Sequence, residues 1–203
     1  MSNNKPVSKK ALESGKKYRL WGKKNKEGLR KIQALRDIPK FNVKVGNLGG
    51  WVESEKNLSQ GGDCWVGDEA WVYGDAQVFG DAWVHGDAQV YGSARVSGNA
   101  WVYGSAWVSG NARVYGSAWV SKDAWEVSPL YIQGTKHSVT TSSFNTLTIG
   151  CETHTVEEWL ANYREIGKAN GYSKQEIEEY FDHITYSAKR LDQIKKKLSN
   201  DYH

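Results

Sequence analysis

Small apolar residues recur every six positions through the middle of this 203-residue chain. Valine occupies ten consecutive repeat positions from Val66 to Val120, and alanine precedes nearly every valine by two residues. Side chains two apart in a strand point to the same face, so alanine and valine are expected inside and the residue between them outside. Glycine followed by Asp, Ser or Asn separates most repeats, which is turn chemistry. Each hexad therefore predicts a short strand and a corner.

The outward positions indicate how many hexads make one coil. Read at intervals of eighteen residues, they sort into two rows that contain tryptophan and one row that contains none. Because this sorting needs three hexads per coil, the sequence predicts a three-sided parallel β-helix of a little over three coils. The rows are Trp65, Trp83, Trp101 and Trp119; Trp71, Gln89, Trp107 and Trp125; and Gln77, Arg95 and Arg113.

The hexads occupy only the middle of the chain, and the segments on either side follow other patterns. The N-terminal segment is rich in lysine and is expected to form a basic tail and a β cap. After Val120 the register breaks, and short apolar runs alternate with turn residues. The expected boundaries are 1–60 for the tail and cap, 61–126 for the stem, 127–154 for short strands and 155–203 for two helices.

Two amphipathic stripes support the assignment of the C-terminal segment. The first begins at Thr155 and the second at Ser173, and each begins with a capping box that ends in glutamate three residues later. Apolar residues then recur at intervals of three and four, which predicts two helices with one buried face each. Since a solenoid needs its open ends covered, this helical hairpin is expected to pack against the stem or a second copy of the chain.

Charge is distributed unevenly along the chain, although the net charge is only +4. Residues 1–50 contain fourteen Lys or Arg and three acids, whereas residues 61–127 contain three bases and eight acids. The basic head suits a phosphate or an acidic protein, but the acidic stem argues against a continuous nucleic-acid track. Two cysteines are too few for a disulfide framework, and no segment is long and apolar enough to span a membrane. A soluble cytoplasmic protein without membrane contact is therefore expected.

The hexads resemble the stems of left-handed β-helix proteins, which are three-sided and have 18 residues per coil. A narrower resemblance covers nearly the whole chain and rests on its two ends. These ends are similar to those of a family of uncharacterised proteins from bacteriophages, prophages and bacteria, which carries a hexapeptide stem between them. The resemblance implies a mainly β protein, a left-handed parallel β-helix with an N-terminal β cap and a C-terminal helical hairpin. The matching segments are YRLWGKK, IQALRDI, VGNLGGWVESEKNLSQGGDCWV and LTIGCETHTVEEWLANYREIGKANGYSKQEIEEY.

The known enzymes with such a stem are acyltransferases, and in that family acyl-CoA lies between subunits beside a histidine. The only histidine of the stem here is His85, in an outward position next to the Trp83 row. The hexads run without the long loop insertions that build the acceptor site in that family. The resemblance therefore leaves an acyl-CoA-dependent acyltransferase, with His85 as general base, as the alternative function.

Three residues after the stem are candidate metal ligands. Cys151 and His154 are spaced like part of a metal site, and His137 lies one expected hairpin away. Structural zinc usually takes four ligands from paired Cys or His motifs, so the signal is weak, and neither a metal nor a cofactor is expected. We instead expect Cys151 to be buried at the end of a strand and His154 to lie at the entry to the first helix. Cys64 occupies an inward alanine position and is expected to be structural.

Outward aromatic and arginine residues form the expected interaction surface, because Trp, Tyr and Arg are the residues that most often anchor interfaces. The aromatic rows also exceed what a monomer normally leaves in water, so a homo-oligomer, a dimer or trimer, is expected. We therefore expect a non-catalytic binding protein. In the phage setting that the resemblance implies, it would engage or inhibit a host factor, such as a defence enzyme or its nucleotide signal. The expected contact residues are Trp71, Tyr73, Tyr91, Trp107, Arg95 and Arg113.

Overall fold

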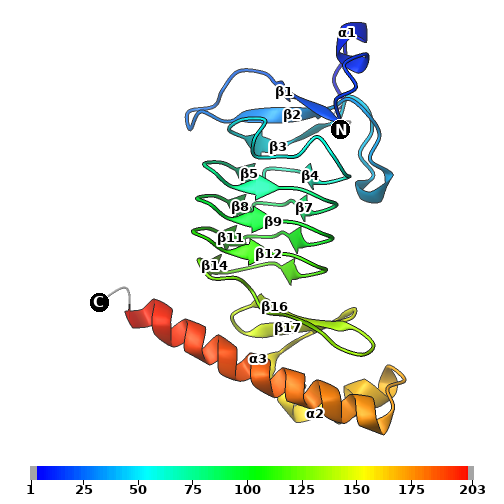
Figure 1. Ribbon diagram of the computed structural model, residues 1–203, viewed down its shortest axis with the longest axis vertical. Coiled ribbons are helices and arrows are strands. Elements are labelled where there is room, and N and C mark those ends of the chain that lie inside the picture. Colours follow the sequence, from blue (N-terminus) through cyan, green and yellow to red (C-terminus); the bar gives the residue numbers. More distant parts are fainter. Residues whose placement is uncertain (1–3, 201–203) are drawn as a thin grey trace.

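The computed structural model describes residues 4–200, with side chains described as far as residue 197. A parallel β-solenoid of about four coils forms the middle of the molecule, with an N-terminal β cap at one end and a small sheet with two helices at the other (Figure 1). The mainly β architecture and the helical C-terminal segment are therefore as predicted. The left-handed sense of the coil stays a prediction.

Three sheets form the sides of the solenoid, and residues eighteen apart lie opposite each other in parallel register, as Trp83 and Trp101 do. The eighteen-residue period of the sequence therefore corresponds to one coil of the solenoid. The first face contains β4 (Trp65–Val66), β7 (Trp83–Val84), β10 (Trp101–Val102) and β13 (Trp119–Val120). The second face contains β3 (Leu48–Val52), β5 (Trp71–Val72), β8 (Gln89–Val90), β11 (Trp107–Val108) and β14 (Ala124–Trp125), and the third contains β6 (Gln77–Val78), β9 (Arg95–Val96) and β12 (Arg113–Val114).

The interior of the solenoid consists of the repeated valine and alanine side chains. Every repeat valine from Val66 to Val120, and every repeat alanine from Ala70 to Ala118, is at most 1% exposed. Cys64 is also fully buried in an alanine position, as predicted. Small side chains are required here because three short strands meet around one narrow axis. At the corners, the repeat glycines have positive φ, for example +69° at Gly86, which glycine adopts without steric strain.

The N-terminal cap shares a sheet with the stem. The antiparallel strands β1 (Tyr18–Trp21) and β2 (Arg30–Ala34) continue through β3 into the second face, so this sheet has seven strands. A buried lysine fixes the cap to the first coil. The Lys17 amine donates to the carbonyl oxygen of Cys64 at 2.8 Å and lies 3.0 Å from its sulfur, and burial lowers the pKa of this amine. The remaining elements here are α1 (Lys9–Leu12) and the 3₁₀ turn η1 (Pro39–Phe41).

The last coil departs from the predicted register. Trp107 lies opposite Ala124 and Val108 opposite Trp125, so this coil is one residue shorter than the eighteen-residue coils before it. Asp123, with φ +67°, forms its corner. A one-residue shift exchanges the two faces of a strand, so Ala124 is exposed and Trp125 is fully buried. The prediction that Trp125 extends the outer row of the second face was wrong, because this side chain closes the end of the solenoid core.

A four-stranded antiparallel sheet and a helical hairpin follow the stem. The short strands were predicted except for the fourth, which continues directly into the first helix. Both predicted capping boxes are present, with Glu158 N–H donating to Thr155 Oγ1 and Glu176 N–H to Ser173 Oγ. No helix within residues 4–200 combines the length and the apolar character needed to cross a membrane. The elements are β15 (Tyr131–Gln133), β16 (Ser138–Ser143), β17 (Thr146–Ile149), β18 (Glu152–Thr155), α2 (Val156–Ala169) and α3 (Lys174–Asn200).

Candidate binding site

The six predicted contact residues lie on two different faces of the solenoid. Four are on the second face, where the rings of Tyr73 and Tyr91 stack at 5.2 Å and Trp107 is 47% exposed. The two arginines, Arg95 and Arg113, are on the third face in strands β9 and β12. The structure therefore does not gather all six into one patch, and each face has to be considered separately. Trp71, Tyr73, Tyr91 and Trp107 make up the second-face group.

A groove of about 530 Å³ runs along the third face. The two arginines form one side of it, and they lie opposite each other in the parallel ladder between β9 and β12. Three further lining residues directly follow repeat valines, and Ser128 lies beyond the last hexad. We call this feature the third-face groove, and its lining residues are Phe79, Arg95, Ser97, Arg113, Tyr115 and Ser128.

The repeat itself explains why the third face is hollowed. Phe79, Ser97 and Tyr115 occupy the same position in three successive coils, since the N–H of Phe79 donates to Val96 and that of Ser97 to Val114. Two exposed aromatic rings therefore flank a single small residue. Adjacent coils are separated by about 4.8 Å, so the backbone positions of the two aromatic residues lie about 9.6 Å apart. The missing side-chain volume at Ser97 forms the gap between them.

Within residues 4–197 the structure pairs neither Arg95 nor Arg113 with a carboxylate, and both residues are exposed. Two like charges on adjacent strands repel each other by about 1 kcal/mol at water-like dielectric. An anion bound to both would remove this repulsion and form charge-assisted hydrogen bonds. The third-face groove thus combines uncompensated positive charge with exposed aromatic surface.

The first face is partly covered by the cap, and His85 belongs to an aromatic stack there. Trp65 is 2% exposed, and the ring of Phe41 from η1 stacks on Trp83 at 4.8 Å. The imidazole of His85 lies between Trp83 and Tyr103, with ring centroids 3.8 Å and 5.5 Å away.

The environment of His85 argues against a role as an accessible base. Its Nδ1 is 3.7 Å from Asp68, while its Nε2 is buried and has no hydrogen-bond partner among the described residues. Burial lowers the pKa of His85, so the ring is neutral near pH 7. Because Nε2 is buried, a substrate could not reach it, and this geometry does not support the alternative hypothesis of an acyltransferase.

The three candidate metal ligands do not form a cluster. Cys151 is exposed in the turn between β17 and β18, so the expectation that it is buried was wrong. The additional strand β18 is the reason, because it places Cys151 at a hairpin tip. His154 on this strand lies 3.2 Å from Glu152 and packs edge-on against Trp159, whereas His137 faces Tyr172. Among residues 4–197, no three His, Cys, Asp or Glu side chains are grouped so that they could hold a metal ion.

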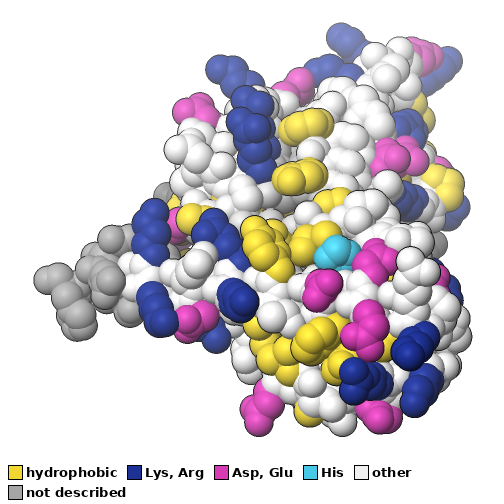
Figure 2. All heavy atoms as spheres, turned by 60° about the horizontal axis from the view of Figure 1, so that its bottom comes forward, with side chains coloured by type: hydrophobic (Ala, Val, Ile, Leu, Met, Phe, Trp, Pro, Cys, Tyr) yellow, Lys and Arg dark blue, Asp and Glu magenta, His cyan; other side chains and the backbone are white. Residues whose placement is uncertain are grey.

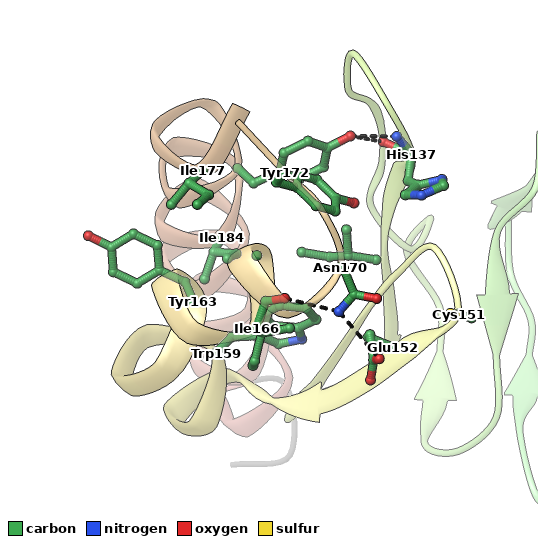
Figure 3. Close-up of a pocket in the computed structure, with 13 residues that line it drawn as sticks. His137, Cys151, Glu152, Trp159, Tyr163, Ile166, Asn170, Tyr172, Ile177 and Ile184 are labelled. Carbon is green, nitrogen blue, oxygen red and sulfur yellow. Dashed lines mark hydrogen bonds between the residues drawn. The ribbon is translucent and has the colours of Figure 1, made fainter. Parts of the chain in front are cut away.

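A second cavity lies between the helical hairpin and the small sheet (Figure 3). Its volume is about 60 Å³, which matches about two water molecules and is far below the 300–1,000 Å³ that is usual for ligand pockets. Polar contacts close its rim: the Tyr180 hydroxyl donates to the carbonyl of His137, and the Asn170 amide lies 3.5 Å from Glu152 (Figure 3). Burial raises the pKa of Tyr172, another lining residue, to about 12. We interpret this cavity as a packing space under the hairpin.

Four of the six groove residues were not among the predicted contact residues: Phe79, Ser97, Tyr115 and Ser128. Phe79 precedes Tyr115 by thirty-six residues, which is two coils, so the spacing that sorted the tryptophans could have found it. Ser128 lies beyond the last hexad, and no periodic signal points to it. Its hydroxyl accepts a hydrogen bond from the backbone N–H of Arg113 at 3.0 Å.

Comparison with known proteins supports the repeat architecture of the stem. A family model described as YdcK Beta solenoid repeat matches residues 88–104, 94–110 and 106–122. Successive matches are offset by six and twelve residues, which are whole hexads, and they include the strands that contain Arg95 and Arg113. No curated protein matches the chain. The stem is therefore similar to a β-solenoid repeat family over residues 88–122, which include four of the six residues that line the third-face groove.

Proposed function

We propose that this protein is a non-catalytic binding protein whose recognition surface is the third-face groove. The observation that carries the proposal is the pair of unneutralised arginines beside two exposed aromatic rings. Phe79 is 39% and Tyr115 49% exposed. Arginine and aromatic side chains dominate binding energy in known interfaces. The groove lining contains no His, Cys, Asp or Glu, so it offers no evident nucleophile or general base beyond serine.

The N- and C-terminal segments resemble a family found in bacteriophages and prophages, which suggests what kind of partner the groove binds. We propose that the partner is a host factor, either a defence protein or a nucleotide signal, which the protein engages or inhibits. A solenoid presents a long, rigid surface without moving parts, and rigid surfaces lose little conformational entropy on binding. This architecture therefore suits a protein that sequesters a ligand.

A capture experiment with matched variants tests the binding proposal. The immobilised protein is exposed to bacterial lysate, and retained proteins and nucleotides are identified by mass spectrometry. The Arg95→Glu/Arg113→Glu double variant should lose the component that the wild type retains, since removing an anchor typically weakens binding about thirtyfold. Gln77→Glu is the matched control, because Gln77 lies opposite Arg95 on the same face but outside the groove. Equal retention by all three proteins would contradict the proposal.

We also propose that the protein is a dimer or trimer. Seen from the helical end, hydrophobic side chains gather on the surface among charged groups (Figure 2). Leu160 on α2 is 39% exposed and Tyr186 on α3 is 57% exposed. Burying such residues against a second copy would remove apolar area from water. Light scattering should give a mass of two or three 22.8 kDa chains at micromolar concentration, and the mass of a single chain would contradict this.

A further inference from the structure

An aromatic residue borders the gap in the third-face groove on each side. The backbone positions of Phe79 and Tyr115 are two coils apart, which corresponds to about 9.6 Å, and only the small Ser97 lies between them. Both aromatic side chains are exposed, so a flat ligand that enters the gap would have an aromatic ring on either side of it. The groove is therefore suited to a heteroaromatic ring held between two protein rings.

One wall of this gap is supported from behind. The ring of Tyr131 from β15 packs against Tyr115 at 5.9 Å, and its hydroxyl donates to Gln133 at 2.9 Å. Gly116 lies directly under the Tyr131 ring, where a Cβ atom would come within 2.7 Å. The Tyr115 wall is thus held between the stem and the C-terminal sheet, which reduces the entropy lost when a ligand binds.

The backbone positions of the two arginines lie close to the gap. Arg95 precedes Ser97 by two residues, and Arg113 precedes Tyr115 by two residues, which is about 6–7 Å along an extended backbone. A ribose separates a nucleobase from its 5′-phosphate on this scale. Two guanidinium groups can bind the phosphate oxygens with several hydrogen bonds, which is the preferred geometry of arginine for phosphate.

Two serine hydroxyl groups complete the lining of the groove. Ser97 forms the floor of the gap, and Ser128 lies beside Arg113. Since the Ser128 oxygen already accepts a bond from the Arg113 backbone, its own proton remains available as a donor. These hydroxyls can bond the ribose or a base edge, as neutral donors and acceptors do in nucleotide sites.

We propose that the third-face groove binds a nucleoside 5′-phosphate, with the base between Phe79 and Tyr115 and the phosphate on Arg95 and Arg113. This inference rests on the proposed function, because it names the ligand class of the same groove. A free nucleotide fits better than a nucleic-acid strand. The stem segment 61–127 contains eight acids and only three bases, so a longer polyanion would meet repulsion beyond the two arginines.

Isothermal titration calorimetry with the full-length protein tests the ligand class. The probes are AMP, GMP, CMP and UMP, with adenosine and inorganic phosphate as the two halves of AMP. At least one mononucleotide should bind saturably, with adenosine and phosphate each at least tenfold weaker. Arg95→Gln/Arg113→Gln should weaken binding at least tenfold, since charge-assisted hydrogen bonds are lost. Ser97→Phe should abolish it by filling the gap while both charges remain.

Two controls keep the outcome interpretable. Gln77→Ala should bind like the wild type, and far-UV circular dichroism should show that Ser97→Phe, an outward substitution, retains the β-solenoid. No saturable binding of any mononucleotide at millimolar concentration would overturn the inference, as would undiminished binding by folded Ser97→Phe. Affinity that rises steadily with oligonucleotide length would assign the groove to a strand instead. If no nucleotide binds but lysate capture still depends on Arg95 and Arg113, the nucleotide inference fails and the proposed function stands.

Discussion

Replacement of Trp125 by alanine should destabilise the protein far more than replacement of Trp107. Trp125 is fully buried, packs against Phe144 with ring centroids 4.7 Å apart, and donates its indole N–H to the backbone carbonyl of Lys122 at 2.8 Å. Removing such a side chain costs about 3–5 kcal/mol, which includes the cavity that it leaves. Trp107 is 47% exposed on the same face, so Trp107→Ala should cost only about 1–2 kcal/mol and leave no internal cavity.

Urea unfolding followed by far-UV circular dichroism measures this difference. With a slope of about 2–3 kcal/mol per molar urea, the Trp125→Ala midpoint should lie roughly 1 M below that of Trp107→Ala. The comparison tests the shortened last coil, since a regular eighteen-residue coil would place both residues on the outer face. Equal midpoints for the two variants would refute the inward placement of Trp125 and the register that explains it.

Three further predictions concern stability. Burial lowers the pKa of His85 below 6.5, so the unfolded chain binds more protons than the folded chain at mildly acidic pH. The free energy of unfolding, measured by urea titration, should therefore rise with pH up to about 6.5. His85→Gln should flatten that slope. Val90→Asp should prevent folding because it places an unpaired charge in the dry core, whereas the outward control Gln89→Asp should fold, as judged by circular dichroism. Thr155→Ala removes the side-chain acceptor of the α2 capping box and should lower Tm by about 2–4 °C in calorimetry.

The core of the solenoid could be predicted because its constraint is local and periodic. A narrow three-sided interior accepts only small side chains, so Val90 and its equivalents repeat without exception. The end of the stem could not be predicted by extending the repeat. Lys122 occupies the position of the usual corner glycine, and the positive φ falls on the next residue, Asp123. The coil is therefore one residue shorter, which moves Trp125 inward. The break after Val120 indicates that the regular repeat ends there, but the sequence does not show that the next strand is shifted by one residue.

The candidate site was predicted only in part, for a different reason. Arg95 and Arg113 belong to the one outward row that contains no aromatic residue, so they could be identified from the sequence. The groove, however, depends on the residues that directly follow the repeat valines, where the small Ser97 between Phe79 and Tyr115 leaves a gap. Phe79 was readable from the same eighteen-residue period, whereas the contribution of Ser128 depends on how the chain returns after the last coil. The groove is formed by side chains from several rows together, so it cannot be predicted from the arginine row alone.

The most direct test of the third-face groove is to observe its arginine side chains during binding. The chain contains seven arginines, and the Nε–H signals of an isotope-labelled sample can be assigned by Arg95→Lys and Arg113→Lys. On titration with the best-binding mononucleotide, the signals of Arg95 and Arg113 should shift together along one saturation curve. The signals of the cap arginines Arg19, Arg30 and Arg36 should remain unchanged. Shifts confined to the cap arginines, or no shift at saturating ligand, would contradict the assignment of the groove as the binding site.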